Sequence, residues 1–156
     1  MATNRLFLFP YEYSLDKDVL TKIDEALLVF LDQWNSHGSQ ITTRNWVEEN
    51  QFVFIAVNEE TTSASGCSKD KLFGFFKKLN STLGISGGRL NKFYVQTEDK
   101  ISLFSKHEIK EALDNGNITL DSNVYPTWIS SEEEYDQIWK KPLEAYSILF
   151  KLNQLK

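Results

Sequence analysis

The residues of this chain that could do chemistry gather around its single cysteine. Cys67 lies in a run of small and polar residues, Ser65-Gly66-Cys67-Ser68-Lys69-Asp70, between an apolar strand pattern and an amphipathic helix pattern. The start of a helix presents free backbone amides and the positive end of the helix dipole, and both stabilise a thiolate or a bound anion. The turn therefore predicts where a site lies, but not its reaction.

One hypothesis for this turn is thiol chemistry, with Cys67 and His37 as the candidate catalytic residues. His37 ends the first predicted helix, and the topology derived below brings that end close to Cys67. A helix start, Lys69 and an imidazole each favour the thiolate, which is the nucleophilic and oxidisable form. The chain would then be a thiol-dependent enzyme or redox sensor. The competing interpretation is that Cys67 is a small buried residue and His37 an ordinary helix C-terminal residue.

A second hypothesis uses the same turn without the sulfur, as a site for a small phosphate or carboxylate. Backbone amides and hydroxyls would bind the anion, a lysine would supply charge, and Trp34 would form an apolar wall. The candidate anion-binding residues are Ser65, Gly66, Ser68, Lys69 and Asp70. The competing interpretation is a plain helix cap, in which Gly66 serves backbone geometry and Ser68 caps the helix.

Several enzyme classes find no support in the sequence. The chain has no Gly-x-x-x-x-Gly-Lys-Ser/Thr loop, because its glycine cluster at residues 84–88 lacks both the spacing and the lysine. Two histidines and one cysteine make a structural zinc site improbable, so we predict no metal and no cofactor. The favoured function is a non-enzymatic binding or protein-interaction domain.

The elements that must position the turn form a recognisable order. Residues 5–9 read as a buried strand. The next predicted element is a helix that Ser14 caps and Gly38 ends, with apolar residues at three- and four-residue spacing from Leu20 to Trp34. Residues 40–47 and 51–58 read as a hairpin, followed by a helix starting near Cys67 and a strand at 90–96. This β-α-β-β-α-β order predicts an α+β, ferredoxin-like split βαβ core over residues 1–96.

Residues 97–156 read as a mixed C-terminal extension of a single domain that spans residues 1–156. A short strand at 101–104 precedes two capping boxes, Ser105–Glu108 and Ser131–Glu134, which open two further helices. Both helices of a split βαβ core lie on one sheet face. We expect the extension or a second subunit of a homodimer to cover the other face, and the candidate covering residues are Trp128, Trp139, Tyr146 and Phe150.

Composition and charge bear on the partners. The 156 residues are 41% hydrophobic and carry a formal net charge of −5, which favours a globular domain and disfavours binding to nucleic acid. Phe7, Phe9, Phe52 and Phe54 resemble the stacking aromatics of RNA-recognition modules, but the motif's basic residue and glycines are missing. One cysteine, no signal-peptide pattern and no apolar run of ~20 residues predict a cytoplasmic protein without a membrane segment.

Three short motifs carry a family resemblance. They are Trp34-Asn35-Ser36-His37-Gly38, Ala64-Ser65-Gly66-Cys67-Ser68 with Asp70, and Trp139-Lys140-Lys141-Pro142. With them, most of the chain resembles a family of small uncharacterised bacterial proteins that are often labelled ABC transporter ATPase. The resemblance implies no established activity, substrate or cofactor. The label itself conflicts with the missing phosphate loop.

Overall fold

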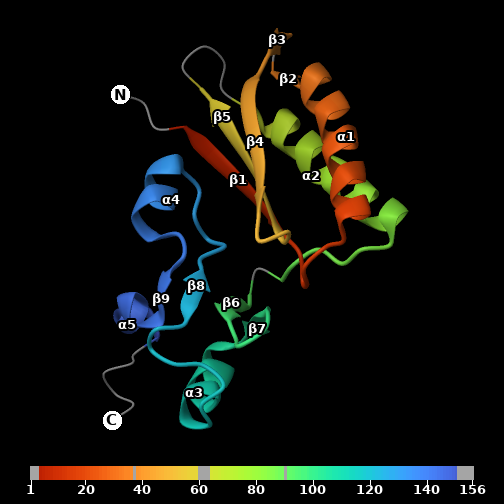
Figure 1. Cartoon of the computed structure of the whole chain (residues 1–156). Coiled ribbons are helices and arrows are strands. Elements are labelled where there is room, and N and C mark those ends of the chain that lie inside the picture. Colours follow the sequence, from red (N-terminus) through yellow and green to blue (C-terminus); the bar gives the residue numbers. More distant parts are fainter. Residues whose placement is uncertain (1–3, 37, 60–63, 90, 151–156) are drawn as a thin grey trace. The chain divides into compact units, whose positions relative to one another are not determined.

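The chain divides into two compact units. The computed structural model describes residues 4–36, 38–59, 64–89 and 91–150 (Figure 1). The first unit comprises residues 1–88 with 130–133, and the second comprises residues 89–129 with 134–156. Both contain helices and antiparallel sheet, so the α+β class is confirmed. The division after Gly88 places the predicted strand at 90–96 in the second unit rather than in the core of the first.

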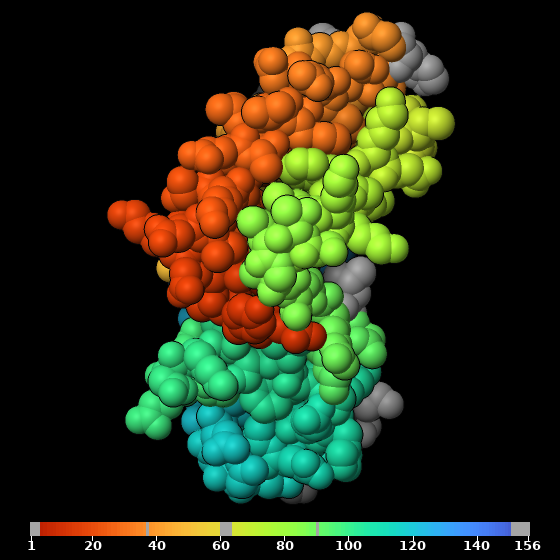
Figure 2. Space-filling model, turned by 90° about the vertical axis from the view of Figure 1, so that its right-hand side faces the viewer, coloured from red at the N-terminus to blue at the C-terminus, as the bar shows by residue number. Residues whose placement is uncertain are grey.

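The first unit is a three-stranded antiparallel sheet with two helices on one side. Its elements are β1 (Arg5–Pro10), α1 (Lys17–Gln33), β2 (Asn35–Ser36), β3 (Ser39–Gln40), β4 (Thr42–Glu48), β5 (Phe52–Asn58) and α2 (Gly66–Leu83). The strand order is β1-β5-β4, and β2 and β3 form a separate small hairpin. Figure 1 shows α1 and α2 on the same face of the sheet, and in Figure 2 the orange segment that contains α1 lies beside the yellow-green segment that contains α2.

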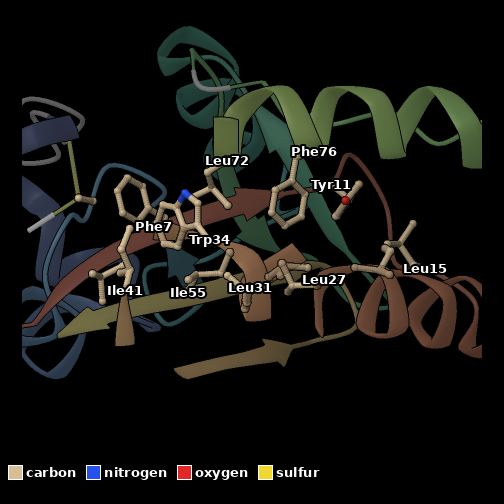
Figure 3. Close-up of a cluster of buried hydrophobic side chains, with 14 residues drawn as sticks. Phe7, Tyr11, Leu15, Leu27, Leu31, Trp34, Ile41, Ile55, Leu72 and Phe76 are labelled. Atoms are coloured by element: carbon tan, nitrogen blue, oxygen red, sulfur yellow. The ribbon is translucent and has the colours of Figure 1, made fainter. Parts of the chain in front are cut away.

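The core of the first unit lies between the sheet and these helices. Alternate residues of β5, Val53, Ile55 and Val57, point toward the helices and are buried. The apolar stripes of both helices meet them, as the three- and four-residue spacing predicts (Figure 3). The helix residues in this core include Ile23, Leu27, Leu31, Leu72 and Phe76. Each such side chain contributes ~1.5–3 kcal/mol on burial, so this layer holds the first unit together.

The four strand phenylalanines lie on opposite faces of the sheet. The register pairs Phe7 with Ile55, so Phe7 faces the helices. Phe52 and Phe54 alternate with the core residues of β5 and therefore face the other way, and both are fully buried. The rings do not form the open stacking surface that RNA-recognition modules use.

The outer edge of β1 is covered at both ends by backbone from elsewhere in the first unit. The Leu6 N–H donates to the Ser130 carbonyl at 2.9 Å, and the Gly88 N–H donates to the Pro10 carbonyl at 2.6 Å. Glu132 strengthens the first contact, because its carboxylate accepts hydrogen bonds from Asn4 and Arg44. The segment at which the chain leaves the first unit, at Gly88, and the segment at which it returns, at Ser130, thus both hydrogen-bond to β1.

The second unit has its own sheet and its own core. Its elements are β6 (Phe93–Gln96), β7 (Ile101–Phe104), α3 (Lys106–Asp114), β8 (Asn123–Tyr125), α4 (Glu132–Ile138, whose first residues belong to the first unit), β9 (Lys141–Pro142), the 3-10 helix η1 (Leu143–Tyr146) and α5 (Ser147–Phe150). The strand order is β7-β6-β8-β9. Tyr146 and Phe150, predicted as a cover for the first sheet, pack into the core of the second unit.

The partner choice of β6 decides the fold prediction. In a ferredoxin-like core this strand would pair with β1, but here it pairs with β7 and β8. The four-stranded split βαβ sheet is therefore not confirmed. Within the described residues, no helix is long and apolar enough to cross a membrane.

The predicted capping box at the start of α3 is confirmed. The Ser105 Oγ accepts from the Glu108 N–H at 3.1 Å, and a Glu108 carboxylate oxygen accepts from the Ser105 N–H at 2.9 Å. Lys92 donates to the same carboxylate at 3.0 Å. The Ser105 backbone bond and then the Lys92 bond lower the pKa of Glu108 to about 2, because both favour the charged form.

Candidate functional site

The predicted Ser65–Asp70 turn is the start of α2, and its serines cap that helix. Ser65 is the N-cap, and its Oγ accepts from the Ser68 N–H at 3.2 Å. The two hydroxyl oxygens lie 2.9 Å apart and share a further hydrogen bond. The cap is thus Ser65, whereas the sequence analysis considered Ser68 for that role. The hydroxyls that were candidates for anion binding are bonded to each other and to the helix backbone.

The start of α2 is joined to the segment that follows α1. The Ser68 Oγ donates to the Asn35 carbonyl at 2.6 Å, and the Ser65 N–H donates to the Ser36 Oγ at 3.2 Å. The Trp34 Nε1 donates to the Ser68 carbonyl at 2.8 Å. We call these five residues, Trp34, Asn35, Ser36, Ser65 and Ser68, the α1–α2 junction. Both helix ends therefore meet, as the topology argument expected.

Three residues of the junction, Trp34, Ser36 and Ser68, are buried, whereas most of the other described residues of the predicted site are exposed. Ser68 is 3% exposed and Trp34 is 2% exposed, so Trp34 is a core residue rather than an open wall (Figure 3). Cys67, Gly66 and Asp70 are exposed, whereas a buried Cys67 had been the competing expectation. A Cβ at Gly66 would meet no heavy atom within 4 Å, so no close approach requires glycine there.

The proposed partner of Cys67 cannot be placed. His37 lies outside the described residues, so the His37–Cys67 pair stays a prediction. Lys69 is half-buried, and its N–H donates to the Ser65 carbonyl at 2.9 Å within the first helical turn. Among the described residues, no three His, Cys, Asp or Glu side chains are grouped to hold a metal ion.

A surface groove in the first unit was not predicted from the sequence. It has a volume of about 410 Å³ and lies between α1, β3 and β4. Its lining residues are Leu28, Leu31, Asp32, Gln40, Ile41, Thr42, Thr43 and Asn45. We call it the α1–β4 groove. One sequence signal could have indicated it, because the apolar run at residues 27–31 is too wide for a single helix face.

Strand β4 presents an open edge along this groove. The Leu6 N–H points away from β5, so the odd-numbered residues of β1 are the ones bonded to β5. By the same alternation, β5 uses its even-numbered residues toward β4, and Thr43, Asn45 and Val47 direct their N–H and C=O groups outward. In the part of the chain that the structure describes, no strand pairs with that side of β4.

The electrostatics of the α1–β4 groove are acidic. Asp32 lines it, and Asp24 and Glu25 lie one helical turn away from Leu28. No Lys or Arg is among its described lining residues. Over Lys17–Gln33, four carboxylates outweigh two lysines, which leaves a formal charge of −2.

A second groove, of about 580 Å³, belongs to the second unit. Trp128, 42% exposed, lines it together with Ile138, Tyr146 and Ile148. The Tyr146 hydroxyl donates to the Ile138 carbonyl. Burial raises the pKa of Tyr146 to about 12, against the opposing effect of the Lys141 N–H. This groove is formed by short elements that run directly into residues 151–156, which lie outside the description.

Comparisons with protein-family models, curated proteins and solved structures give no significant match to this chain. The resemblance to the bacterial family stays a prediction. The function must therefore be argued from the geometry of the two units.

Proposed function

We propose that this chain is a non-enzymatic protein-interaction domain that binds its partner in the α1–β4 groove. The observation that carries the proposal is the open edge of β4 beside a groove that is lined by three apolar residues and five polar ones. Unpaired backbone groups and apolar side chains on one surface are what an extended polypeptide can satisfy together.

The exposed apolar residues of α1 support this proposal. Leu28 is 70% exposed, and it continues into buried Leu31 and Ile41 at the base of the groove. A single exposed leucine needs no explanation, but a leucine that joins two buried apolar residues at the rim of a groove is typical of a binding surface. Its neighbour Val29 is 61% exposed and does not line the groove.

The Ser65–Asp70 turn gives less support to the alternative functions, a thiol-dependent reaction or an anion site. The Ser65 and Ser68 hydroxyls take part in the helix cap and the α1–α2 junction, so they are not directed at an empty site. A helix start whose serine hydroxyls are bonded within the cap serves structure first.

The proposal is tested by selecting binders from a random 12-residue peptide library on the whole chain. Selected peptides are then titrated against wild type, Leu28→Gln and Val29→Gln by fluorescence anisotropy. We expect about tenfold or greater loss of affinity for Leu28→Gln, since burying a leucine contributes ~1.5–3 kcal/mol and 1.4 kcal/mol is tenfold. Val29→Gln, the matched control, should bind within about twofold of wild type.

The proposal is wrong if no selected peptide distinguishes Leu28→Gln from Val29→Gln. Far-UV circular dichroism and thermal unfolding of both variants must match wild type, which excludes misfolding as the cause of any loss. The helix propensity of Gln is close to that of Leu and higher than that of Val, so we expect both variants to fold.

A further inference from the structure

Resting on this proposed function, we infer that the partner is an extended, basic segment of another protein that joins β4 as an added strand. Its backbone would pair with Thr43, Asn45 and Val47, whose N–H and C=O groups point outward. Its side chains on the helix side would enter the α1–β4 groove. The proposal thus names the conformation and the charge of the partner.

The two edges of the same sheet differ in a way that favours β4 as the docking edge. The β1 edge contains Pro10 and is bridged by Ser131 and Gly87. Strand β4 contains no proline, and its register with β5 continues without a bulge over all seven residues. Proline, bulges and covering segments are the usual protection of an edge strand. The described part of β4 has none of these.

The charge of Arg44, which could protect the edge of β4 from pairing with another strand, lies on the other face of the sheet. Arg44 pairs with Glu132, and its guanidinium lies 4.8 Å from the centre of the Trp46 ring. Arg44 is paired with Ala56, on the face that points away from the helices. The groove side of β4 therefore carries hydroxyl, amide and apolar side chains without a cation.

The shape of the groove fits alternate side chains of a strand. Side chains of an added strand alternate between the two sheet faces, so every second residue would face α1. Buried Ile41 and Leu31 form an apolar base, and Leu28 forms an apolar rim. An aliphatic or aromatic residue is the expected occupant of this position.

The carboxylates of α1 predict a basic sequence around that residue. Asp32 is in the groove wall, and Asp24 and Glu25 are exposed on the neighbouring turn. Lysine or arginine beside the apolar residue would meet this charge at the rim of the groove, where opposite charges chiefly steer association and select partners.

The same charge disfavours a second copy of this chain. Symmetric antiparallel pairing of two β4 strands would extend the sheet and keep both α1 helices on one face. Each copy would then bring an α1 helix with a formal charge of −2 to the same face of the joined sheet. Like charges across an interface suppress such pairing.

The decisive test uses N-methylated versions of the peptides selected on wild type. N-methylation removes one backbone N–H at a time, so it reports whether the bound backbone pairs as a strand. We expect methylation at alternate positions to lower affinity at least about tenfold, and methylation at the intervening positions to change it less than about threefold. We also expect Lys and Arg to be enriched in the selected sequences.

The charge is tested on the protein side with Asp32→Asn, which should lower affinity for the selected basic peptides about two- to fivefold at low salt. Asp136→Asn removes an exposed carboxylate of the second unit, which does not line the groove, and should leave affinity unchanged. The difference between the two variants should shrink at high salt, because salt screens exposed charges.

Failure of this inference is distinguishable from failure of the proposed function. Peptides that bind and lose affinity to Leu28→Gln, but show no alternation on N-methylation or no basic enrichment, overturn the strand proposal and leave the interaction domain standing. A wild-type dimer in sedimentation velocity that Leu28→Gln dissociates, with Val29→Gln unaffected, also overturns it in favour of a second copy. Absence of any groove-dependent peptide removes the proposed function itself.

Discussion

The interpretation of the cysteine turn as a structural junction predicts that the serine beside the cysteine matters more than the cysteine. Ser68→Ala removes the 2.6 Å hydrogen bond to the Asn35 carbonyl and the contact with the Ser65 hydroxyl. One intramolecular hydrogen bond contributes ~0.5–1.5 kcal/mol net, and a carbonyl left unpaired near buried groups adds ~1 kcal/mol or more. Alanine favours the helix by roughly 0.5 kcal/mol, which offsets part of the loss. We expect Ser68→Ala to destabilise the first unit by about 1–2 kcal/mol.

Cys67→Ala is the matched control, because it changes the adjacent residue of the same helical turn. Cys67 is exposed, and substitutions at such positions usually change stability by less than ~0.5 kcal/mol. Urea unfolding followed by far-UV circular dichroism measures both variants. For a urea m-value of ~1–3 kcal/mol/M, the serine variant should lower the midpoint by about 0.3–2 M, with an unchanged m-value.

Because the chain has two units, unfolding can occur in two steps, and a single midpoint would then be misleading. Hydrogen exchange at the first amides of α2 resolves this, since the loss should be seen there before it is seen in the second unit. The reasoning is refuted if Cys67→Ala costs as much stability as Ser68→Ala. That result would mean that the Cys67 side chain contributes as much to the stability of the first unit as the Ser68 hydroxyl does.

Two further predictions concern a buried ring and a charged cap. Trp34→Phe should lower the free energy of unfolding by about 2–4 kcal/mol, because it deletes the indole hydrogen bond to the Ser68 carbonyl and leaves a cavity. Trp128→Phe, at an exposed position, should lower it by less than ~1 kcal/mol. Equal urea midpoints for the two variants would contradict the packing argument. Glu108 should titrate near pH 2 when its carboxyl resonance is followed by NMR, because the Ser105 cap lowers its pKa from 4.5 to about 2. A lowered folded-state pKa means that the cap's contribution is complete above pH 4.5 and is lost as the pH falls toward 2, and Glu108→Gln should remove this dependence.

How far the sequence could predict the site is clear at the α1–α2 junction. Periodicity placed the first helix and the start of the second. The topology argument predicted that His37 and Cys67 approach each other, and the structure joins their neighbours Asn35 and Ser68 by a hydrogen bond. Whether a pair of serines caps a helix or binds an anion could not be decided, because both uses need the same donors. Only the distances show that these hydroxyls bond to each other.

The sheet partner of β6 was beyond sequence reasoning for a different physical reason. A four-residue apolar strand such as Phe93–Gln96 fits many edges, because strand pairing is set by contacts distant in the sequence. At β1, Pro10 lacks an N–H, and Gly88 and Ser130 already bond to the outer side of the strand. The sequence of β6 does not indicate these obstacles, so the ferredoxin-like prediction paired β6 with β1.

The α1–β4 groove could not be predicted from the sequence, because its residues have neither the types nor the spacing of a chemical site. Thr43 and Asn45 have no chemical feature that marks them in the sequence. They matter because their backbone N–H and C=O groups point outward, and this direction follows from the outward-pointing Leu6 N–H at the opposite edge of the sheet. An edge strand without proline, bulge or covering segment tends to pair with whatever strand it meets. Since Arg44 is held by Glu132 on the far face, it does not guard the groove side of that edge. The carboxylates of α1 are then the remaining selective element, and they favour basic strands as partners of β4.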